Sequence, residues 1–406
     1  MSAYEQPSHP LQQQQPSGLE KPLLSLLKKQ LERCQGQLLL TLPSGYQTRF
    51  GQQGPAASLQ LNSLRPFVRL FFGGINGWSE GYPAGEWESQ DLTALIRWAL
   101  KNETRLEQMT KAGFIIRTLH NLYHYSRDNS RRGSRRNIAA HYDLGNEFYR
   151  RWLDAGMTYS AALFAHPGQP LEQAQANKNQ RILQMLDARP GQQIVEIGCG
   201  WGAFARQAAE QNQLRVDGIT LSREQLAWAQ EKSTAAGLDS ALQFSLTDYR
   251  DLQKSYDGVV SIEMFEAVGE AHWDHYFSTL KRILKPGGNA VLQVISIDDQ
   301  RFLKYRKQAD FIQRYIFPGG MLPSVCALKE KIAEHGFVLQ QEQRFGKDYA
   351  ETLRLWRQQF EDNWSEIQQS GFDQRFYRLW RYYLAYCEGG FEEGAIDVGL
   401  YQLRHA

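Results

Sequence analysis

The stretch that decides the fold is Glu196-Ile197-Gly198-Cys199-Gly200-Trp201-Gly202, which ends a short apolar segment and begins a helical pattern. Glycines let a backbone pass close to a ligand, and the start of a helix offers free N–H groups. A Gly-x-Gly-x-Gly motif alone is weak support for a binding site. Its position after the first strand of a strand–helix alternation strengthens it, because ligands bind at the carboxyl ends of such strands.

The chain downstream of residue 139 alternates between strand and helix patterns. Expected helices cover 202–211 and 223–236, and expected strands cover 193–197, 214–219, 242–246, 258–262 and 290–295. This alternation predicts an α/β class with a doubly wound, Rossmann-like and mainly parallel sheet. Residues 336–344 and 395–403 are expected to add the last, antiparallel pair of strands.

The chain upstream of this region has three parts. Residues 1–18 are rich in Gln and Pro and predict a disordered tail. Residues 19–127 predict a small α+β domain, with helices at 19–33, 92–101 and 104–125, a hairpin from 37–42 and 46–50, and an aromatic and glycine-rich segment at 71–87. Residues 128–138 form a basic linker to a second domain at 139–406.

An arginine cluster marks the linker: Arg127, Arg131, Arg132, Arg135 and Arg136. It is either a solvated connection or a contact with anionic phosphates. The chain of 406 residues has 46 Lys and Arg against 44 Asp and Glu, a net charge of +2. This balance favours a local contact with lipid head groups over general nucleic-acid binding.

Composition excludes several classes of protein. The cysteines, Cys34, Cys199, Cys326 and Cys387, lack paired metal-ligand spacing, so no metal site is expected. No apolar run reaches the ~20 residues of a membrane helix, and the start lacks the pattern of a signal peptide, so a cytoplasmic location is expected. Aromatic residues make up 12% of the chain, which is high for a chain with balanced charge.

The second expected strand ends in Thr220-Leu221-Ser222, without the acid that a nicotinamide dinucleotide site requires. Asp248 and Tyr249, after the third strand, are candidates to bind and stack on an adenine ring. Glu196 is a candidate to hold the amino group of an amino acid. This arrangement resembles class I methyltransferases that bind S-adenosylmethionine.

Further motifs resemble the cyclopropane-fatty-acyl-phospholipid synthases and the related mycolic acid cyclopropane synthases. They lie at 141–146, 157–160, 196–202, 220–225, 248–250, 264–266, 315–324 and 345–349. The resemblance implies a cofactor site made by Tyr159, Ser160, Glu196, Gly198, Cys199, Gly200, Trp201, Gly202, Thr220, Leu221, Ser222, Gln225, Asp248, Tyr249 and Ile262.

The resemblance also implies methyl transfer to the cis double bond of an unsaturated phospholipid acyl chain. The resulting carbocation must be kept from water and lose a proton, giving a cyclopropane or a methyl- or methylene-branched chain. The implied partners are membrane phospholipid, the anionic inner membrane surface and a second copy of the chain in a homodimer. The segment 299–317 would cover the acyl tunnel.

The chain departs from that family where the family binds a bicarbonate ion as the base. Glu266, Tyr349 and the amide of Ile295 match, but Ala161 and Gln293 stand where the family has Cys and His, Ala267 replaces another His, and Glu263 replaces Gly. Bicarbonate is therefore doubtful as a cofactor, and Glu263 or Glu266 is a candidate base. The alternative is that Glu263 is a rim residue of a poorly active homologue.

The candidate catalytic residues are Glu266, Tyr349, Glu263 and Cys387. Cys387 matches a cysteine sometimes proposed as catalytic in the family, although packing is the simpler role for a buried thiol. Two other functions stay open. One is a methyltransferase for a soluble small molecule, and the other is a catalytically silent lipid-binding protein.

Overall fold

A computed structural model describes residues 15–109 and 144–405, and its contacts divide the chain into two compact units at residues 1–114 and 115–406. The predicted linker at 128–138, its arginines and His141 lie outside the described residues, as does most of the predicted tail. Ser17, near the end of the predicted tail, is among the described residues, and its backbone N–H donates to Glu20 Oε2 at 2.7 Å. Among the described residues, no helix is long and apolar enough to cross a membrane.

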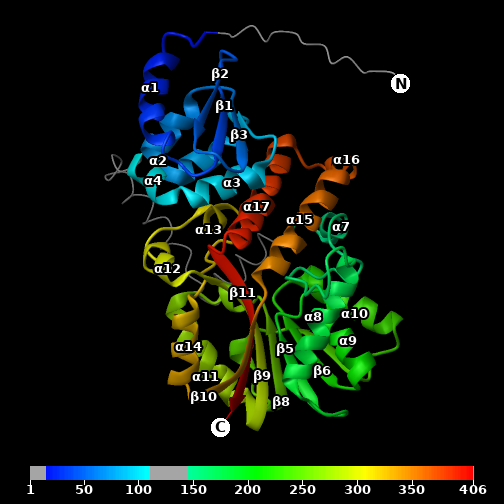
Figure 1. Cartoon of the computed structure of the whole chain (residues 1–406). Helices are drawn as coiled ribbons and strands as arrows, with labels where there is room; N and C mark the ends of the chain where they lie inside the picture. Colours follow the sequence, from blue (N-terminus) through cyan, green and yellow to red (C-terminus); the bar gives the residue numbers. More distant parts are fainter. Residues whose placement is uncertain (1–14, 110–143, 406) are drawn as a thin grey trace, which may run out of the picture. The chain divides into compact units, whose positions relative to one another are not determined.

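The first unit is a four-stranded sheet with helices (Figure 1). The sheet order is β2-β1-β3-β4, with β1 and β3 parallel and the other pairs antiparallel. Its elements are α1 (Glu20–Leu31), β1 (Gln37–Thr41), β2 (Gln47–Gly51), β3 (Ala56–Leu61), α2 (Arg65–Gly81), β4 (Trp87–Glu88), α3 (Leu92–Lys101) and α4 (Glu103–Met109).

The structure confirms the predicted hairpin and the helix at 92–101, and it adds elements that the sequence analysis lacked. Strand β3 was not predicted. The aromatic and glycine-rich segment is largely helix α2, which kinks at Gly74 (φ 62°). The second half of this segment reaches β4, where the ring of Trp87 stacks on Trp78 at 5.5 Å and its indole N–H donates to the Trp78 carbonyl. This pair anchors α2 to the edge of the sheet.

The second unit is a seven-stranded sheet in the order β10-β11-β9-β8-β5-β6-β7. The strands are β5 (Gln193–Ile197), β6 (Arg215–Thr220), β7 (Leu242–Leu246), β8 (Tyr256–Ile262), β9 (Leu284–Ile297), β10 (Phe337–Arg344) and β11 (Ile396–His405). Strands β5 to β9 pair in parallel, and β11 runs antiparallel to both β9 and β10. The predicted doubly wound α/β sheet and its antiparallel pair are confirmed.

Helices cover both faces of this sheet (Figure 1). Helices α8 (Leu171–Leu186), α9 (Ala203–Asn212) and α10 (Arg223–Ala235) gather on one side, and α11 (Trp273–Ile283) and α14 (Val325–Glu334) lie on the other. The remaining helices are α7 (Asn146–Arg150), α12 (Asp299–Tyr305), α13 (Phe311–Tyr315), α15 (Gly346–Asp362), α16 (Trp364–Gln369) and α17 (Gln374–Glu392). The predicted boundaries of β5 and β7 are met at every residue. The apolar run of β5 ends at Gly198, and the alternation of apolar and polar residues in β7 ends at Thr247 and Asp248.

This topology positions the site. The chain leaves β5 toward β6 on one side, and β8 lies on its other side, so β5 marks the point where the sheet order reverses. Apolar residues of β5, β8 and β9, such as Val195, Val259 and Val294, are fully buried and hold these three strands in one core. The residues that directly follow β5 and β8 therefore lie next to each other, at the carboxyl ends of these two parallel strands.

Candidate active site

The glycine loop after β5 is held against the end of β6. The N–H groups of Gly198 and Cys199 both donate to the Ile219 carbonyl, at 2.9 and 3.0 Å. A side chain on Gly202 would meet the Phe244 ring at 3.0 Å, so glycine there permits the close approach of α9 to the sheet. Gly200 has a positive φ of 52° and open space where a side chain would point. The loop therefore presents bare backbone to a ligand at this position.

Glu196 lies directly before this loop and is buried, with an exposure of 3%. Burial raises the pKa of its carboxyl group to about 8, although Lys178 and Arg206 pull it down. Its Oε2 atom has no hydrogen-bond partner among the described residues. A buried carboxylate oxygen without a donor is costly, so this atom fits the ammonium group of an amino-acid ligand.

The end of β6 forms a small polar network where an acid is missing. The Thr220 hydroxyl donates to Gln225 Oε1 at 2.8 Å, and the Ser222 N–H donates to the Thr220 hydroxyl at 3.1 Å. Ser222 also caps α10 by accepting from the Gln225 N–H. Leu221 lies between these residues and is half-buried. Neutral groups thus occupy the position expected to hold the ribose.

Asp248 and Tyr249 lie beyond the end of β7, as predicted, but Asp248 has a partner that the sequence analysis did not name. The guanidinium of Arg250 donates to both carboxylate oxygens of Asp248, at 2.8 and 2.6 Å. Tyr249 packs edge-on against Tyr276 at 5.4 Å, and burial raises its pKa to about 12. Arg250 therefore fixes the acid that an adenine amino group would meet.

Trp201 and Tyr159 join an aromatic cluster around the glycine loop. The indole N–H of Trp201 donates to Asn146 Oδ1 at 2.7 Å, a role for Asn146 that the sequence analysis missed. The Tyr159 hydroxyl lies 2.8 Å from the Tyr383 hydroxyl. The rings of this cluster lie within 6.5 Å of one another in a chain of contacts, and they belong to Tyr149, Trp152, Tyr159, Trp201, Phe317, Trp356 and Tyr383.

Glu263 directly follows β8, and both of its carboxylate oxygens accept hydrogen bonds. Its Oε1 accepts from the Ala161 N–H at 2.8 Å and from the Gln293 amide at 2.7 Å, and its Oε2 accepts from the Tyr349 hydroxyl at 2.6 Å. Burial raises its pKa, and the three donors oppose that rise. The backbone of Glu263 is left-handed (φ 49°), a conformation that costs a residue other than glycine about 1 kcal/mol.

Glu266 lies one turn further on and differs from Glu263 in its contacts. Its Oε1 accepts from the Ile295 N–H at 2.5 Å, whereas its buried Oε2 has no partner among the described residues. Burial, followed by the nearby charge of Glu263, raises its pKa to about 8. The site therefore holds two different carboxylates close to Ile262, at the end of β8. Glu263 is saturated, meaning that both of its oxygens accept hydrogen bonds. Glu266 has one open oxygen, meaning an oxygen without a hydrogen-bond partner among the described residues.

Two cysteines, Cys199 and Cys387, are among the candidate residues. Cys199 is 4% exposed, and its Cβ lies 3.2 Å from where a side chain on Gly218 would begin, so it fills space against β6. Cys387 lies on α17, and burial and the charge of Asp310 raise the pKa of its thiol. Neither environment favours a thiolate.

The sequence analysis missed Lys178, which lies on the buried face of α8. It is 1% exposed, and its Nζ donates to the Ser160 hydroxyl at 3.0 Å. Gln175, one turn earlier, donates to the Ser160 carbonyl at 2.8 Å. A helical pattern through Leu171, Ala174, Lys178 and Ile182 places Lys178 on the core face, so periodicity could have revealed it.

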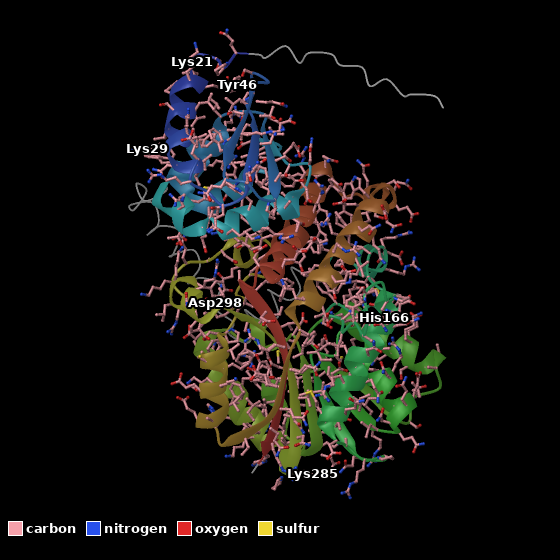
Figure 2. All side chains as sticks on the ribbon, viewed as in Figure 1. Lys21, Lys29, Tyr46, His166, Lys285 and Asp298 are labelled. Carbon is pink, nitrogen blue, oxygen red and sulfur yellow. The ribbon has the colours of Figure 1, made fainter. Side chains whose placement is uncertain are left out.

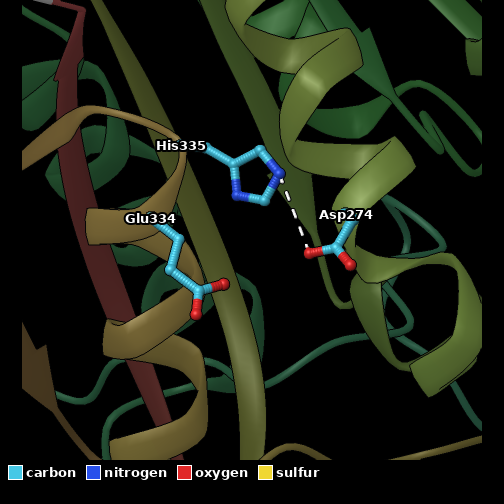
Figure 3. Close-up of side chains that lie close together, drawn as sticks. All are labelled: Asp274, Glu334 and His335. Atoms are coloured by element: carbon cyan, nitrogen blue, oxygen red, sulfur yellow. Dashed lines mark ion pairs between the residues drawn. The ribbon is translucent and has the colours of Figure 1, made fainter.

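A group of side chains outside this site has the composition of a metal centre: Asp274, Glu334 and His335 (Figure 3). The ammonium of Lys331 lies 2.8 Å from both Asp274 Oδ1 and Glu334 Oε2. A cation of the chain already neutralises these exposed acids, so the group is explained as a surface ion-pair network.

Comparison with known proteins agrees with this geometry. Residues 129–401 match the family model described as mycolic acid cyclopropane synthetase. The tuberculostearic acid methyltransferase UfaA1 of Mycobacterium tuberculosis is 38% identical over 340 residues, 80% of this chain and 78% of that protein. The cyclopropane-fatty-acyl-phospholipid synthase of Escherichia coli K12 is 35% identical over 356 residues, 86% of this chain and 87% of that protein.

A solved structure is similar as well. The mycolic acid cyclopropane synthase CmaA1, in complex with SAH and CTAB, is 31% identical, with a TM-score of 0.62, and the match covers 66% of this chain and 97% of that one. The unpartnered Oε2 of Glu196 and the bare backbone at Gly200 fit S-adenosylmethionine, which supplies an electrophilic methyl group when bound. The chain therefore belongs to the mycolic acid cyclopropane synthetase family and is an S-adenosylmethionine-dependent methyltransferase that acts on lipids.

Proposed function

We propose that this enzyme methylates the cis double bond of an unsaturated phospholipid acyl chain and uses its own carboxylates to complete the reaction. The observation that carries the proposal is the half-buried pair Glu263 and Glu266 at the end of β8, in which one carboxylate accepts three hydrogen bonds and the other has a buried oxygen without a partner among the described residues. An alkene is a weak nucleophile, so the chain must hold it in line with the methyl donor. The aromatic cluster around Tyr159 would shield the resulting carbocation from water and stabilise it with π faces.

The two carboxylates suit different tasks. The open Oε2 of Glu266 can accept the proton that the carbocation must lose, and its raised pKa makes it a stronger base once ionised. Glu263 cannot change partners without breaking contacts to Ala161, Gln293 and Tyr349. It would instead hold Tyr349 in place and contribute fixed negative charge to the site.

The same contacts argue against a bound bicarbonate. The groups that the family resemblance assigns to that ion include the Tyr349 hydroxyl and the Ile295 N–H. The first donates to Glu263 and the second to Glu266. Because both donors have partners within the chain, we propose that the Glu263 carboxylate takes the place of the ion. The three donors that engage the Glu263 carboxylate, from Ala161, Gln293 and Tyr349, also argue against a role at the rim of the site.

The test is the dependence of the reaction on bicarbonate. Wild-type enzyme is expected to act on unsaturated phospholipid in bicarbonate-free buffer. Glu263→Gly leaves space at the carboxylate position and suits the left-handed backbone. It is expected to lose roughly 100-fold in kcat, the scale of one lost electrostatic contact in an active site, and to regain activity with added bicarbonate or formate. Mass spectrometry of the lipid products measures both effects.

Glu263→Gln is the matched control, because it keeps the shape but removes the charge and should not be rescued by either ion. A requirement for bicarbonate in the wild-type enzyme, together with an unchanged product yield in Glu263→Gln, would contradict the proposal.

The mass spectra also identify the product. We propose a cyclopropane chain, and a methyl- or methylene-branched chain is the second candidate, because Glu263 alters the surroundings of the carbocation.

Access to acyl chains requires contact with a membrane, and α2 has a suitable face. Val68, Phe71 and Phe72 follow helical spacing before the kink at Gly74, and Ile75 comes directly after it. Each of the four is more than half exposed, between 52% and 58%. Elsewhere on this unit, α1 carries exposed basic residues including Lys21 and Lys29, which point away from the helix (Figure 2). We propose that the α2 face inserts into the surface of an anionic bilayer.

The double variant Phe71→Ser/Phe72→Ser is expected to weaken binding to anionic phospholipid vesicles by about tenfold or more, since each buried ring contributes roughly 1.5–3 kcal/mol at full burial. Vesicle sedimentation measures the loss, and affinity for S-adenosylmethionine should not change. Val338→Ser, an exposed apolar residue on β10 (53% exposed), is the matched control. If the double variant binds vesicles normally but changes from dimer to monomer, the α2 face is a subunit interface instead. Normal vesicle binding by both would contradict the proposal.

A further inference from the structure

We propose that Lys178 is a positioning residue whose buried ammonium links the cofactor side of the site, at Ser160 and Glu196, to the carboxylate of Glu263. The inference deepens the function of the same site, and it depends on cofactor binding rather than on the identity of the lipid product. No motif in the sequence pointed to it.

The first support is the position of the charge. An ammonium at 1% exposure has lost nearly all its water, which is costly unless nearby groups replace the hydration. Its one hydrogen bond among the described residues runs to the Ser160 hydroxyl at 3.0 Å. An ammonium can donate three, so Lys178 is held by surrounding charge more than by direct contact.

The second support is the set of groups that surround it. Three carboxylates attract the ammonium, in the order Glu263, Glu196 and Asp154. They come from three segments: the residue after β8, the end of β5, and the loop before Tyr159. Asp154 is itself fixed by the N–H groups of Gly156 and Thr158, at 2.9 and 2.8 Å, so it orders the loop that carries Ser160.

Other charged and titratable groups act on the carboxylates that surround Lys178. Arg206 on α9 acts on Glu196, and the hydroxyl of Tyr349 on α15 donates to Glu263. Besides burial, the charge of Glu263 in turn raises the pKa of Glu266. Among these described groups, Lys178 is the cation that attracts both Glu196 and Glu263. It therefore favours the ionised form of both acids.

The charge of Lys178 matters before the cofactor binds. Glu196 must be ionised to accept the ammonium of the cofactor, but burial favours its neutral form. Lys178 offsets that tendency before the cofactor arrives. The same burial lowers the pKa of Lys178 to about 8, so the contribution is present at neutral pH and is lost as the pH rises through that value.

The test measures affinity for S-adenosylhomocysteine by calorimetry from pH 6.5 to 9.5, without lipid. Lys178→Met is expected to bind about tenfold more weakly than wild type at pH 7, the scale of one interaction with a charged group. The ratio of the two affinities should approach one by pH 9.5, because Glu196 then ionises unaided and wild-type Lys178 has lost its charge. Lys178→Arg should restore part of the affinity at pH 7.

Asn179→Ala is the control for damage to α8, since Asn179 is buried on the same helix but donates to Gln207, away from the site. A loss that is equal at every pH would mean that Lys178 only supports folding and would overturn the proposal. An unchanged affinity at pH 7 would overturn it as well. Because no lipid enters the experiment, these outcomes do not depend on which lipid product the enzyme makes.

Discussion

Glu266→Gln is expected to lower kcat for lipid methylation by about a thousandfold, within the range measured for the loss of a general base. The glutamine side chain would keep the shape of the glutamate, but its amide cannot take a proton from a carbocation. Affinity for the cofactor should stay within roughly threefold, because the interaction is made only during the chemical step. Single-turnover assays with labelled S-adenosylmethionine and unsaturated phospholipid vesicles separate the two effects.

The dependence of kcat on pH tests whether Glu266 acts in its ionised form. The pKa of Glu266 is raised to about 8, so the carboxyl group is mainly protonated at neutral pH and gains its basic form as the pH rises. The kcat of the wild type should therefore increase from pH 6.5 toward 8 and then level off. The positive charge of the bound cofactor shifts the rise to lower pH. A Glu266→Gln variant that keeps full kcat, or a wild-type profile that falls over this range, would remove Glu266 from the role of base.

Glu196→Gln is expected to have the second large effect, a loss of about 100-fold in affinity for S-adenosylmethionine. The carboxylate would be a buried charge-assisted acceptor for the ligand's ammonium, and such interactions contribute roughly 1.5–3 kcal/mol or more when desolvated. The substituted amide keeps the volume and removes the charge. Equilibrium binding at pH 7.5 measures the change, and a parallel thermal-unfolding curve tests whether the variant is folded.

Asp257→Asn is the matched control. It removes one negative charge near the amino end of β8, where Asp257 pairs with Lys285 at 2.6 Å, far along the strand from the glycine loop. Its affinity for the cofactor should equal that of the wild type. If Glu196→Gln binds as tightly as this control, the cofactor's ammonium must be held by other groups and the role given to Glu196 is wrong.

The sequence predicted the architecture of the second unit well because two periodicities specify it. Strand β5 is a short apolar run, and β7 alternates apolar with polar residues. Helix α10 between β6 and β7 starts at the capping residue Ser222. The first unit was harder to predict. Strand β3 contains Ala56, Ser58 and Gln60 on its outer face, a weak strand pattern, and helix α2 contains the Gly73-Gly74 pair that favours a break.

The site was predictable only where a motif names its residues. Glu263 and Glu266 were found because they stand at motif positions, yet nothing in the sequence indicated that one carboxylate would be saturated and the other left open. That difference depends on contacts with Ala161, Gln293 and Ile295, which lie 29 to 102 residues away in sequence. The motif at 248–250 included Arg250 but did not indicate that it pairs with Asp248. The helical pattern places Lys178 on the core face, but its contact with Ser160 appears only in the folded chain.

The left-handed backbone at Glu263 bears on how such a site can persist in a lineage. Glycine would relieve the unfavourable conformation at this position, and one base change in a glutamate codon yields a glycine codon. Random mutation therefore has an easy route that removes the carboxylate and improves the local backbone. A protein that had stopped using this acid would be expected to take that route early. Retention of the glutamate against this preference of the backbone is expected only where the acid is in use, and sequences of near relatives can be searched for the substitution.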